Sequence, residues 1–223
     1  MQVDAVVVAA GRSTRFGEGD KLLADLNGRP LIAWSLAALA EAGSIGRVAI
    51  VGREDLLGAL TGIGRDVLGE ALAAVVPGGA RRRDSVEAGL RAVASEYVAI
   101  HDGARPLVTP ALIDACVEAA AEAAGAILVG PVTDTIKEVE GATIVGSPER
   151  GRLRAAQTPQ VVRREAWLQA AALSEGDETD DAAMLARTGL EVRTVEGDPS
   201  NLKVTRPIDL MLAQALLAER EGS

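Results

Sequence analysis

Residues 6–21, VVVAAGRSTRFGEGDK, place cations and glycines in an order that could hold phosphate. An apolar run, Val6–Ala10, ends at Gly11, and Arg15 and Lys21 follow among further glycines. Glycine lets backbone N–H groups approach an anion closely, and arginine and lysine neutralise its charge. A buried strand that ends in such a loop is typical of ligand sites at the carboxyl ends of parallel strands.

This loop matches neither of the two commonest nucleotide-binding patterns. Five residues separate Gly11 from Gly17, where the P-loop has four, and no Gly-Lys-Ser/Thr follows. The dinucleotide pattern GxGxxG is also absent. The alternative interpretation is a surface turn with solvated cations, so the loop alone indicates phosphate chemistry without identifying a ligand.

Composition excludes several classes of function. The 223 residues suffice for one domain with a full core, and the net charge of −9 argues against a general nucleic-acid or membrane-surface binder. One histidine, His101, and one cysteine, Cys116, disfavour a multi-ligand zinc site and exclude a disulfide within the chain. We interpret Cys116 as a small buried hydrophobe and His101 as a packed residue at a strand end.

Neither a secretory signal nor a membrane span is evident. The N-terminus has no basic region, and no stretch of about 18 uncharged apolar residues occurs. The expected location is the cytoplasm.

Strand and helix patterns alternate through the first 132 residues. We expect strands at Val3–Ala9, Arg47–Val51, Ala73–Val76, Tyr97–His101 and Ala126–Val132. We expect helices at Pro30–Ala42, Asp84–Ala94 and Thr109–Ala124, with a shorter helical piece at Glu54–Leu60. Pro110 suits a first helical position after a Thr109 cap, and Asp84 or Ser85 could cap the helix before it. Such alternation favours parallel βαβ units.

The pattern changes after residue 132. Residues 133–157 lack helical periodicity and contain a turn at Glu140-Gly141, so we expect an antiparallel β-arm there. Helices are expected at 163–174, 179–188 and Arg206–Arg220, with a strand at Glu191–Val195. No linker or repeat occurs, so residues 1–223 are interpreted as a single domain with an arm inserted at about 133–157.

Seven motifs along the chain carry a family resemblance: AAGRSTRFGEGDK (9–21), GGARRRDSV (78–86), HDGARP (101–106), PVTDTIK (131–137), QTPQ (157–160), TDDA (179–182) and NLKVTRPIDL (201–210). With these motifs the chain resembles the nucleotidyltransferases of the nucleoside-diphosphate-sugar type. More closely, it resembles the 2-C-methyl-D-erythritol 4-phosphate cytidylyltransferase family, nearly end to end. The resemblance implies an α/β fold with a Rossmann-like, mostly parallel sheet flanked by helices and a protruding β-arm. It also implies a homodimer whose arms interlock and share the sites.

The reaction that the resemblance implies is cytidylyl transfer in isoprenoid precursor synthesis. The phosphate of methylerythritol phosphate attacks the α-phosphorus of CTP, and pyrophosphate leaves. Because a phosphate nucleophile is already ionised near neutral pH, no strong general base is needed. Positioning and charge stabilisation suffice, helped by Mg²⁺ or another divalent cation.

The resemblance also implies roles for individual residues. The catalytic set is Arg15, Lys21, Asp102 and Lys203, and Asp102 also helps to place the metal. The cytidine site comprises Ala9, Ala10, Gly11, Gly79 and Ser85. The methylerythritol phosphate site comprises Arg105, Thr135, Arg150, Thr158, Thr179 and Lys203, with Arg105 and Thr135 reaching in from the partner. From the residues alone, Arg81–Arg83 is a solvated run of which one member could touch substrate.

Three alternatives stay open at this stage. A ribitol 5-phosphate cytidylyltransferase would share fold and chemistry but use another acceptor. A transferase for another sugar phosphate or for a molybdopterin would share the first loop alone, and the later motifs disfavour it. A non-catalytic nucleotide-binding protein is disfavoured by four residues, and turnover of CTP to pyrophosphate would distinguish it; the four are Arg15, Lys21, Asp102 and Lys203.

Overall fold

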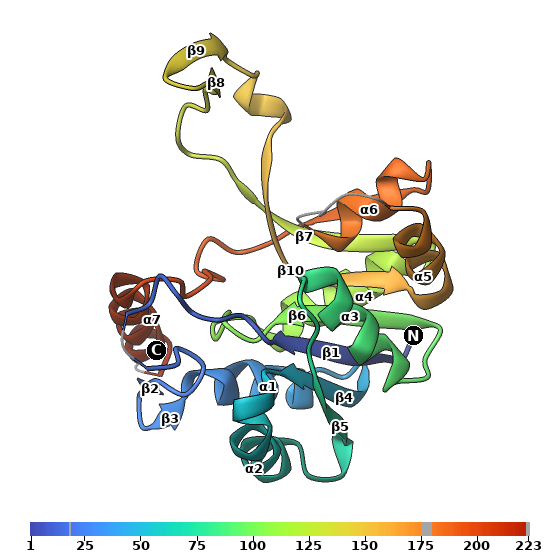
Figure 1. The fold of residues 1–223 in the computed structure, drawn as a ribbon, viewed down its shortest axis with the longest axis vertical. Coiled ribbons are helices and arrows are strands. Elements are labelled where there is room, and N and C mark those ends of the chain that lie inside the picture. Colours follow the sequence, from blue (N-terminus) through green and yellow to red (C-terminus); the bar gives the residue numbers. More distant parts are fainter. Residues whose placement is uncertain (18, 175–179, 222–223) are drawn as a thin grey trace.

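A sheet between two layers of helices forms the body of the protein, and a long arm projects from it (Figure 1). The computed structural model describes residues 1–17, 19–174 and 180–221. Within these ranges, seven strands form one sheet in the order β11-β7-β10-β6-β1-β4-β5. Their bounds are β1 Val3–Ala9, β4 Ile45–Gly52, β5 Leu72–Pro77, β6 Tyr97–Asp102, β7 Gly125–Pro131, β10 Arg154–Arg163 and β11 Val192–Glu196.

The sheet is mostly parallel, which confirms the predicted α/β fold class. β1 pairs in parallel with β4 on one side and with β6 on the other. The exception is β10, which lies antiparallel between β6 and β7. After β1 the chain adds β4 and β5 on one side and then crosses to β6, so a topological switch point lies beside β1. Ligands of open α/β sheets bind at such a point, outside the carboxyl ends of the strands.

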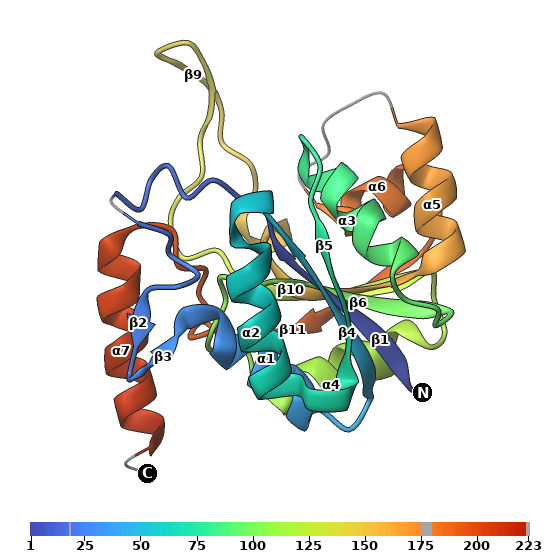
Figure 2. The same cartoon turned by 60° about the horizontal axis from the view of Figure 1, so that its bottom comes forward.

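Helices cover both faces of this sheet (Figure 2). One face carries α1 (Leu31–Glu41), α2 (Leu57–Leu68) and α4 (Pro110–Ala120), and the other carries α3 (Arg82–Arg91), α5 (Arg164–Leu173) and α6 (Asp181–Arg187). A terminal helix, α7 (Pro207–Glu221), lies beside the short hairpin of β2 (Asp25–Leu26) and β3 (Arg29–Pro30). Short 3₁₀ turns occupy Glu54–Leu56, Gly69–Ala71 and Arg150–Arg152.

β1 shows why its apolar run is continuous rather than alternating. Val7 packs into the core beneath α1 and α4, whereas the neighbouring Val6 packs into the core beneath α3 and α5. Successive side chains of a strand point to opposite faces, so a strand covered on both sides needs apolar residues at every position.

Several predicted boundaries are wrong by a few residues. α1 begins at Leu31 with Pro30 as its cap, and α3 begins at Arg82 rather than at Asp84 or Ser85. α2 extends to Leu68, because its packing against α1 and β5 offsets the weak helix propensity of its three glycines, of which Gly64 lies against Ile50 and Leu72. α4 ends at Ala120, but its Thr109 cap is confirmed, since the hydroxyl accepts a hydrogen bond from Leu112 N at 3.3 Å.

The largest error of the sequence prediction is β10, which lay partly in the expected arm and was assigned no strand. Pro159 interrupts its apolar run, and its register against β7 shifts between Ala156 and Gln160. Proline inside a run normally argues against a central strand. Here β10 is nevertheless central, so the arm is an excursion between β7 and β10.

The arm ends in a small antiparallel hairpin of β8 (Glu138–Glu140) and β9 (Thr143–Gly146), with the predicted turn at Gly141. Figure 1 shows this hairpin well away from the sheet. Val139 and Ile144 are 59% and 62% exposed on it, and Val145 is exposed beside them. Apolar side chains on such a slender projection lack a core of their own.

Cys116 and His101 are both buried, as predicted. The thiol of Cys116 lies 3.5 Å from the carbonyl oxygens of Ala126 and Pro159. Burial raises the pKa of this thiol to about 12. Across the described ranges, no helix is long and apolar enough to cross a membrane.

Candidate active site

A cavity of about 360 Å³ opens where β1 and β6 end. β1 and β6 are neighbours in parallel register, with Val8 opposite Asp102, so the loops that follow them meet. Residues from five places in the sequence line the cavity, among them Ala9, Ala10, Gly11, Lys21, Gly79, Arg82, Ser85, Asp102 and Lys203. The fold therefore brings most of the predicted nucleotide and catalytic residues to one cavity.

The wall that follows β5 is a tight glycine turn. A side chain at Gly78 would collide with the Cβ of Ala10, and one at Gly79 would collide with the Cβ of Asp84. The Ser85 hydroxyl accepts a hydrogen bond from Gly79 N at 3.1 Å and donates one to Arg81 O at 3.2 Å. Ser85 therefore shapes this turn from inside the first turn of α3, and the alternative of helix capping is wrong because Arg81 is the cap.

An arginine outside the family motifs fastens the loop after β1. Arg53, which follows β4, pairs with Asp20 at 2.5 Å and donates to Gly11 O at 3.3 Å. The other oxygen of Asp20 accepts from Leu22 N at 2.9 Å. These contacts hold both ends of the loop that carries Arg15.

Lys21 turns from this loop into the cavity. Its Nζ donates to Val204 O at 3.0 Å, and the same peptide segment is held by Val204 N on Ala104 O at 2.8 Å. Burial, together with the charges of Lys203 and Arg15, lowers the pKa of Lys21. Neighbouring cations repel one another, so a cluster of them favours the binding of a polyanionic ligand. Arg15 itself is exposed on the loop and does not line the cavity.

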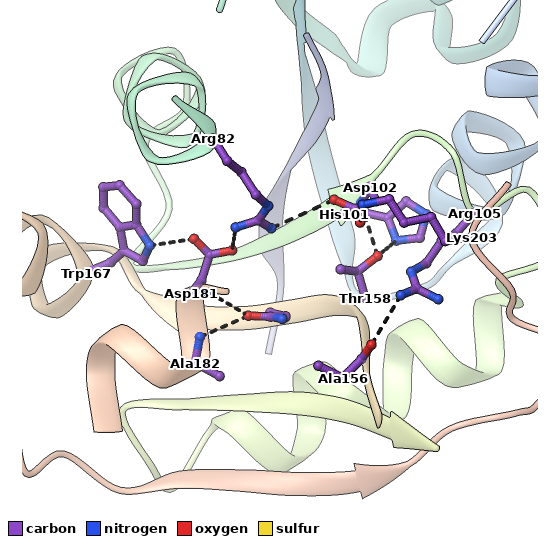
Figure 3. Close-up of polar contacts among 11 residues, drawn as sticks. Arg82, His101, Asp102, Arg105, Ala156, Thr158, Trp167, Asp181, Ala182 and Lys203 are labelled. Atoms are coloured by element: carbon purple, nitrogen blue, oxygen red, sulfur yellow. Dashed lines mark hydrogen bonds and ion pairs between the residues drawn. The ribbon is translucent and has the colours of Figure 1, made fainter. Parts of the chain in front are cut away.

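Asp102, at the end of β6, is the carboxylate of the cavity (Figure 3). One of its oxygens lies 2.7 Å from Lys203 Nζ and the other lies 3.8 Å from Arg82 Nη2. The side chain is almost completely buried. Burial alone would raise its pKa, but Lys203 and Arg82 lower the pKa to about 2. Asp102 is therefore ionised throughout the physiological range.

A hydrogen-bonded chain supports Asp102 from below. Thr158 Oγ1 accepts from Asp102 N at 3.1 Å and lies 3.1 Å from His101 Nδ1 (Figure 3). Burial lowers the pKa of His101 to about 4, which keeps the ring neutral. Thr158 lies beneath the cavity rather than facing it, so the structure does not place its side chain among the lining groups.

Arg105 is turned away from the cavity. Its guanidinium donates to Asn201 O at 2.6 Å and to Ala156 O at 3.2 Å. Asn201 in turn donates to Gln157 Oε1 at 3.1 Å and to Thr158 O at 3.0 Å. These contacts tie β10 to the segment that carries Lys203.

The remaining predicted acceptor-site residues are not brought together within one chain. Thr135 and Arg150 are exposed on the arm, and Arg150 donates to Thr133 O at 3.0 Å. Neither residue lines the cavity. Thr179 lies outside the described residues.

Arg82 and Asp181 are neighbours of the site that the sequence analysis did not assign. The expected solvated run Arg81–Arg83 is only partly correct. Arg81 is exposed and pairs with Asp84, but Arg83 donates to Ser174 O, and Arg82 lines the cavity between Asp102 and Asp181. Burial raises the pKa of Asp181, and Arg82 acts against this shift. The motifs GGARRRDSV and TDDA contained both residues, but nothing in either motif showed that they meet.

The residues present fit magnesium as a cation held mainly by a triphosphate. Mg²⁺ typically binds one or two carboxylates together with substrate phosphates and water. Of the residues that the structure describes, Asp102 is the carboxylate that lines the cavity, and its two nearest charged neighbours are cations. Among the described residues, no three His, Cys, Asp or Glu side chains gather to hold a metal without a substrate.

Comparison with known proteins agrees with this geometry. The family model described as IspD, 2-C-methyl-D-erythritol 4-phosphate cytidylyltransferase, matches residues 3–219. The chain belongs to this family. It is 44% identical to the 2-C-methyl-D-erythritol 4-phosphate cytidylyltransferase of Prochlorococcus marinus, over 96% of this chain and 98% of that one. It is 43% identical to the enzyme of the same name from Rhodococcus jostii, over 97% and 96% of the two chains.

A solved structure supports the assignment. The crystal structure of the 2-C-methyl-D-erythritol 4-phosphate cytidylyltransferase of Thermus thermophilus is 30% identical to this chain, with a TM-score of 0.78. The match covers 98% of this chain and all of that one. The predicted family, the nucleotidyltransferase class of enzyme and the cytidylyl-transfer activity are thereby confirmed.

Proposed function

We propose that this protein transfers the CMP group of CTP to 2-C-methyl-D-erythritol 4-phosphate, giving the cytidine diphosphate-linked alcohol and pyrophosphate. The observation that supports this best is the cavity that unites Lys21, Lys203 and Asp102 beside the glycine turn at Gly79. A cationic wall suits the triphosphate, while the turn offers backbone groups of fixed position to a pyrimidine edge. Family membership supplies the acceptor.

In this proposal an oxygen of the acceptor phosphate attacks the α-phosphorus of CTP. A new phosphorus–oxygen bond forms, the bond between the α-phosphorus and the bridging oxygen breaks, and pyrophosphate leaves. Lys21 and Lys203 hold the phosphates, and Arg15 closes over them from the loop. Magnesium, when bound, would add positive charge at the phosphate oxygens, with Asp102 as its protein carboxylate. No side chain needs to abstract a proton, so the neutral, buried His101 has no catalytic role.

We also propose a homodimer joined through the arms. Thr135 and Arg150 are exposed on the arm and do not line the cavity of their own chain, so in the dimer they would serve the partner's site. The exposed Val139 and Ile144 would become buried in such a dimer. A cytoplasmic location is proposed because CTP is available there and the lone thiol is compatible with a reducing compartment.

The test is pyrophosphate release from CTP and Mg²⁺ with two acceptors measured in parallel. We expect release with 2-C-methyl-D-erythritol 4-phosphate and none with ribitol 5-phosphate. Release with ribitol 5-phosphate instead would keep the mechanism but overturn the acceptor. Release with neither acceptor, from a protein that is folded by circular dichroism, would contradict the proposed function.

A further inference from the structure

Arg82 joins two carboxylates that come from opposite parts of the chain. It begins α3 and lines the cavity. Its Nη1 lies 2.7 Å from Asp181 Oδ2 at the start of α6, and its Nη2 lies 3.8 Å from Asp102 Oδ1 (Figure 3). One guanidinium therefore contacts both Asp181 and the active-site carboxylate Asp102, and its contact with Asp181 is the shorter one.

Asp181 is built as a fixed anchor. It is only 3% exposed, and Trp167 Nε1 donates to its second oxygen at 2.9 Å. Its backbone N–H donates to Gln160 Oε1 at 3.0 Å, and the same oxygen accepts from Ala182 N at 2.9 Å. Asp181 does not line the cavity, so it has no direct contact with a ligand there.

Asp102 needs a second cationic partner besides Lys203, and Arg82, which Asp181 holds, is that partner. Its shortest ion pair is with Lys203, whose side chain is 43% exposed and faces the space for phosphate. A triphosphate in the cavity competes with Asp102 for that ammonium. When Lys203 turns to the phosphate, Arg82 is the nearest remaining cationic side chain for a buried carboxylate, and a buried carboxylate without a counter-charge is costly.

Without the ion pair to Asp181, the triphosphate would compete with Asp102 for Arg82 as well. Guanidinium groups bind phosphate in a bidentate manner, and Arg82 already lines the cavity. The ion pair with Asp181 fixes one edge of the guanidinium and leaves the other edge toward Asp102. The ion pair with Asp181 thus determines whether Arg82 contacts Asp102 or the phosphates.

We propose that Asp181 is a positioning residue for the transfer reaction: it holds Arg82 toward Asp102 and away from the triphosphate. This inference rests on the proposed function, because the reaction it affects is cytidylyl transfer. It gives a role to the second aspartate of the TDDA motif, which the active-site assignment left without one.

The first experiment compares wild type with Asp181→Asn in steady-state pyrophosphate release. Asparagine keeps the size of the side chain and an oxygen for Trp167 but removes the charge that holds Arg82. We expect kcat to fall by about tenfold to a hundredfold, the usual effect of losing an outer partner of an active-site group. We expect KM for CTP to stay unchanged or to fall, because the released Arg82 adds a cation to the phosphate site.

Trp167→Phe is the matched control. It removes one hydrogen bond from Asp181 and loosens the same core but leaves the charge in place, so we expect kcat within about threefold of wild type. Melting temperatures of both variants are measured without substrate. A purely structural role for Asp181 would lower the melting temperature in both variants and leave kcat unchanged at temperatures where both are folded.

Comparison of Arg82→Gln with the Arg82→Gln/Asp181→Asn double variant gives the second test, and this pair can be read even if Asp181→Asn alone is poorly folded; where Asp181→Asn folds, the four proteins form a full double-mutant cycle. If Asp181 acts through Arg82, its substitution costs little further kcat once Arg82 is gone. Additive losses would overturn the proposal, as would an unchanged kcat or a raised KM for CTP in Asp181→Asn.

Pyrophosphate release by the wild-type protein tests the proposed function separately from the role of Asp181. If wild type releases no pyrophosphate, the proposed function fails. Calorimetric measurement of CTP binding then tests whether Asp181 holds Arg82 away from the triphosphate. Asp181→Asn should bind CTP at least as tightly as wild type, and weaker binding would contradict this role of Asp181.

Discussion

Replacing Lys21 by methionine should abolish most turnover while leaving the fold almost unchanged. Methionine keeps the length of the side chain and removes the ammonium. In the free protein that ammonium makes one hydrogen bond, to Val204 O at 3.0 Å. Losing it costs about 1 kcal/mol of unfolding free energy. Lys21 also lies among Lys203 and Arg15, which lower its pKa together with burial, so removing the charge relieves repulsion and offsets part of that cost.

The effect on the reaction should be much larger. In the proposed complex Lys21 faces the phosphates, where charge develops as pyrophosphate leaves. Removing one such donor typically costs about 3 to 4 kcal/mol, or a hundredfold to a thousandfold in kcat. A loss of at most 1 kcal/mol in stability corresponds to about 2 to 4 °C in melting temperature for a chain of this length.

The assay is steady-state pyrophosphate release with saturating acceptor, together with thermal unfolding in the absence of ligands. Arg65→Met is the matched control, since Arg65 is an exposed cation on α2 that does not line the cavity. We expect the control to keep wild-type turnover. Near-normal turnover in Lys21→Met would refute the reasoning, and so would a collapse in melting temperature that accounts for the lost activity.

Three further predictions concern other parts of the molecule. The pKa of His101 is about 4 when folded and about 6.5 when unfolded. The unfolded state therefore binds the proton first, and acidification from pH 6.5 to 4 should lower the unfolding free energy by about 3 kcal/mol. Urea titrations of wild type and His101→Gln test this, and equal losses in both would contradict it. Cys116, with its pKa raised to about 12, should react with iodoacetamide at pH 8 only after denaturation; mass spectrometry showing rapid labelling of the folded protein would argue otherwise. Val139→Asp with Ile144→Asp should convert the proposed dimer to a monomer in sedimentation experiments without changing the melting of the sheet, and an unchanged mass would disprove the arm interface.

Local patterns predicted the regular elements of the fold well. The continuous apolar run of β1 predicted a buried strand, and Thr109-Pro110 marked the start of α4. The start of α3 was wrong because Asp84 resembles a cap, whereas it acts from within the helix by accepting a hydrogen bond from Arg81 N at 3.1 Å. β10 could not be found from its own residues, since its place between β6 and β7 comes from pairing with distant strands.

In the candidate site, too, the sequence identified residues whose side-chain contacts only the structure shows. Lys21, Asp102 and Lys203 were identified from motif residues, and the fold places them around one cavity. Thr158 and Arg105 were expected at the acceptor, which stays a prediction; within this chain Thr158 Oγ1 accepts from Asp102 N and Arg105 donates to Asn201 O. Motif resemblance identified these positions but could not show which way their side chains turn.

The sequence by itself determined the α/β class, the glycine-rich loop with its cations and the family, because strand patterns, loop composition and ordered motifs are properties of short stretches. Only the tertiary structure decided that Arg82 lies between Asp102 and Asp181. These residues come from three elements, α3, β6 and α6. They meet because β10 lies beside β6 in the sheet and because α5 and α6 pack against β10. Contacts of this kind arise from packing between distant segments, and no local pattern encodes them.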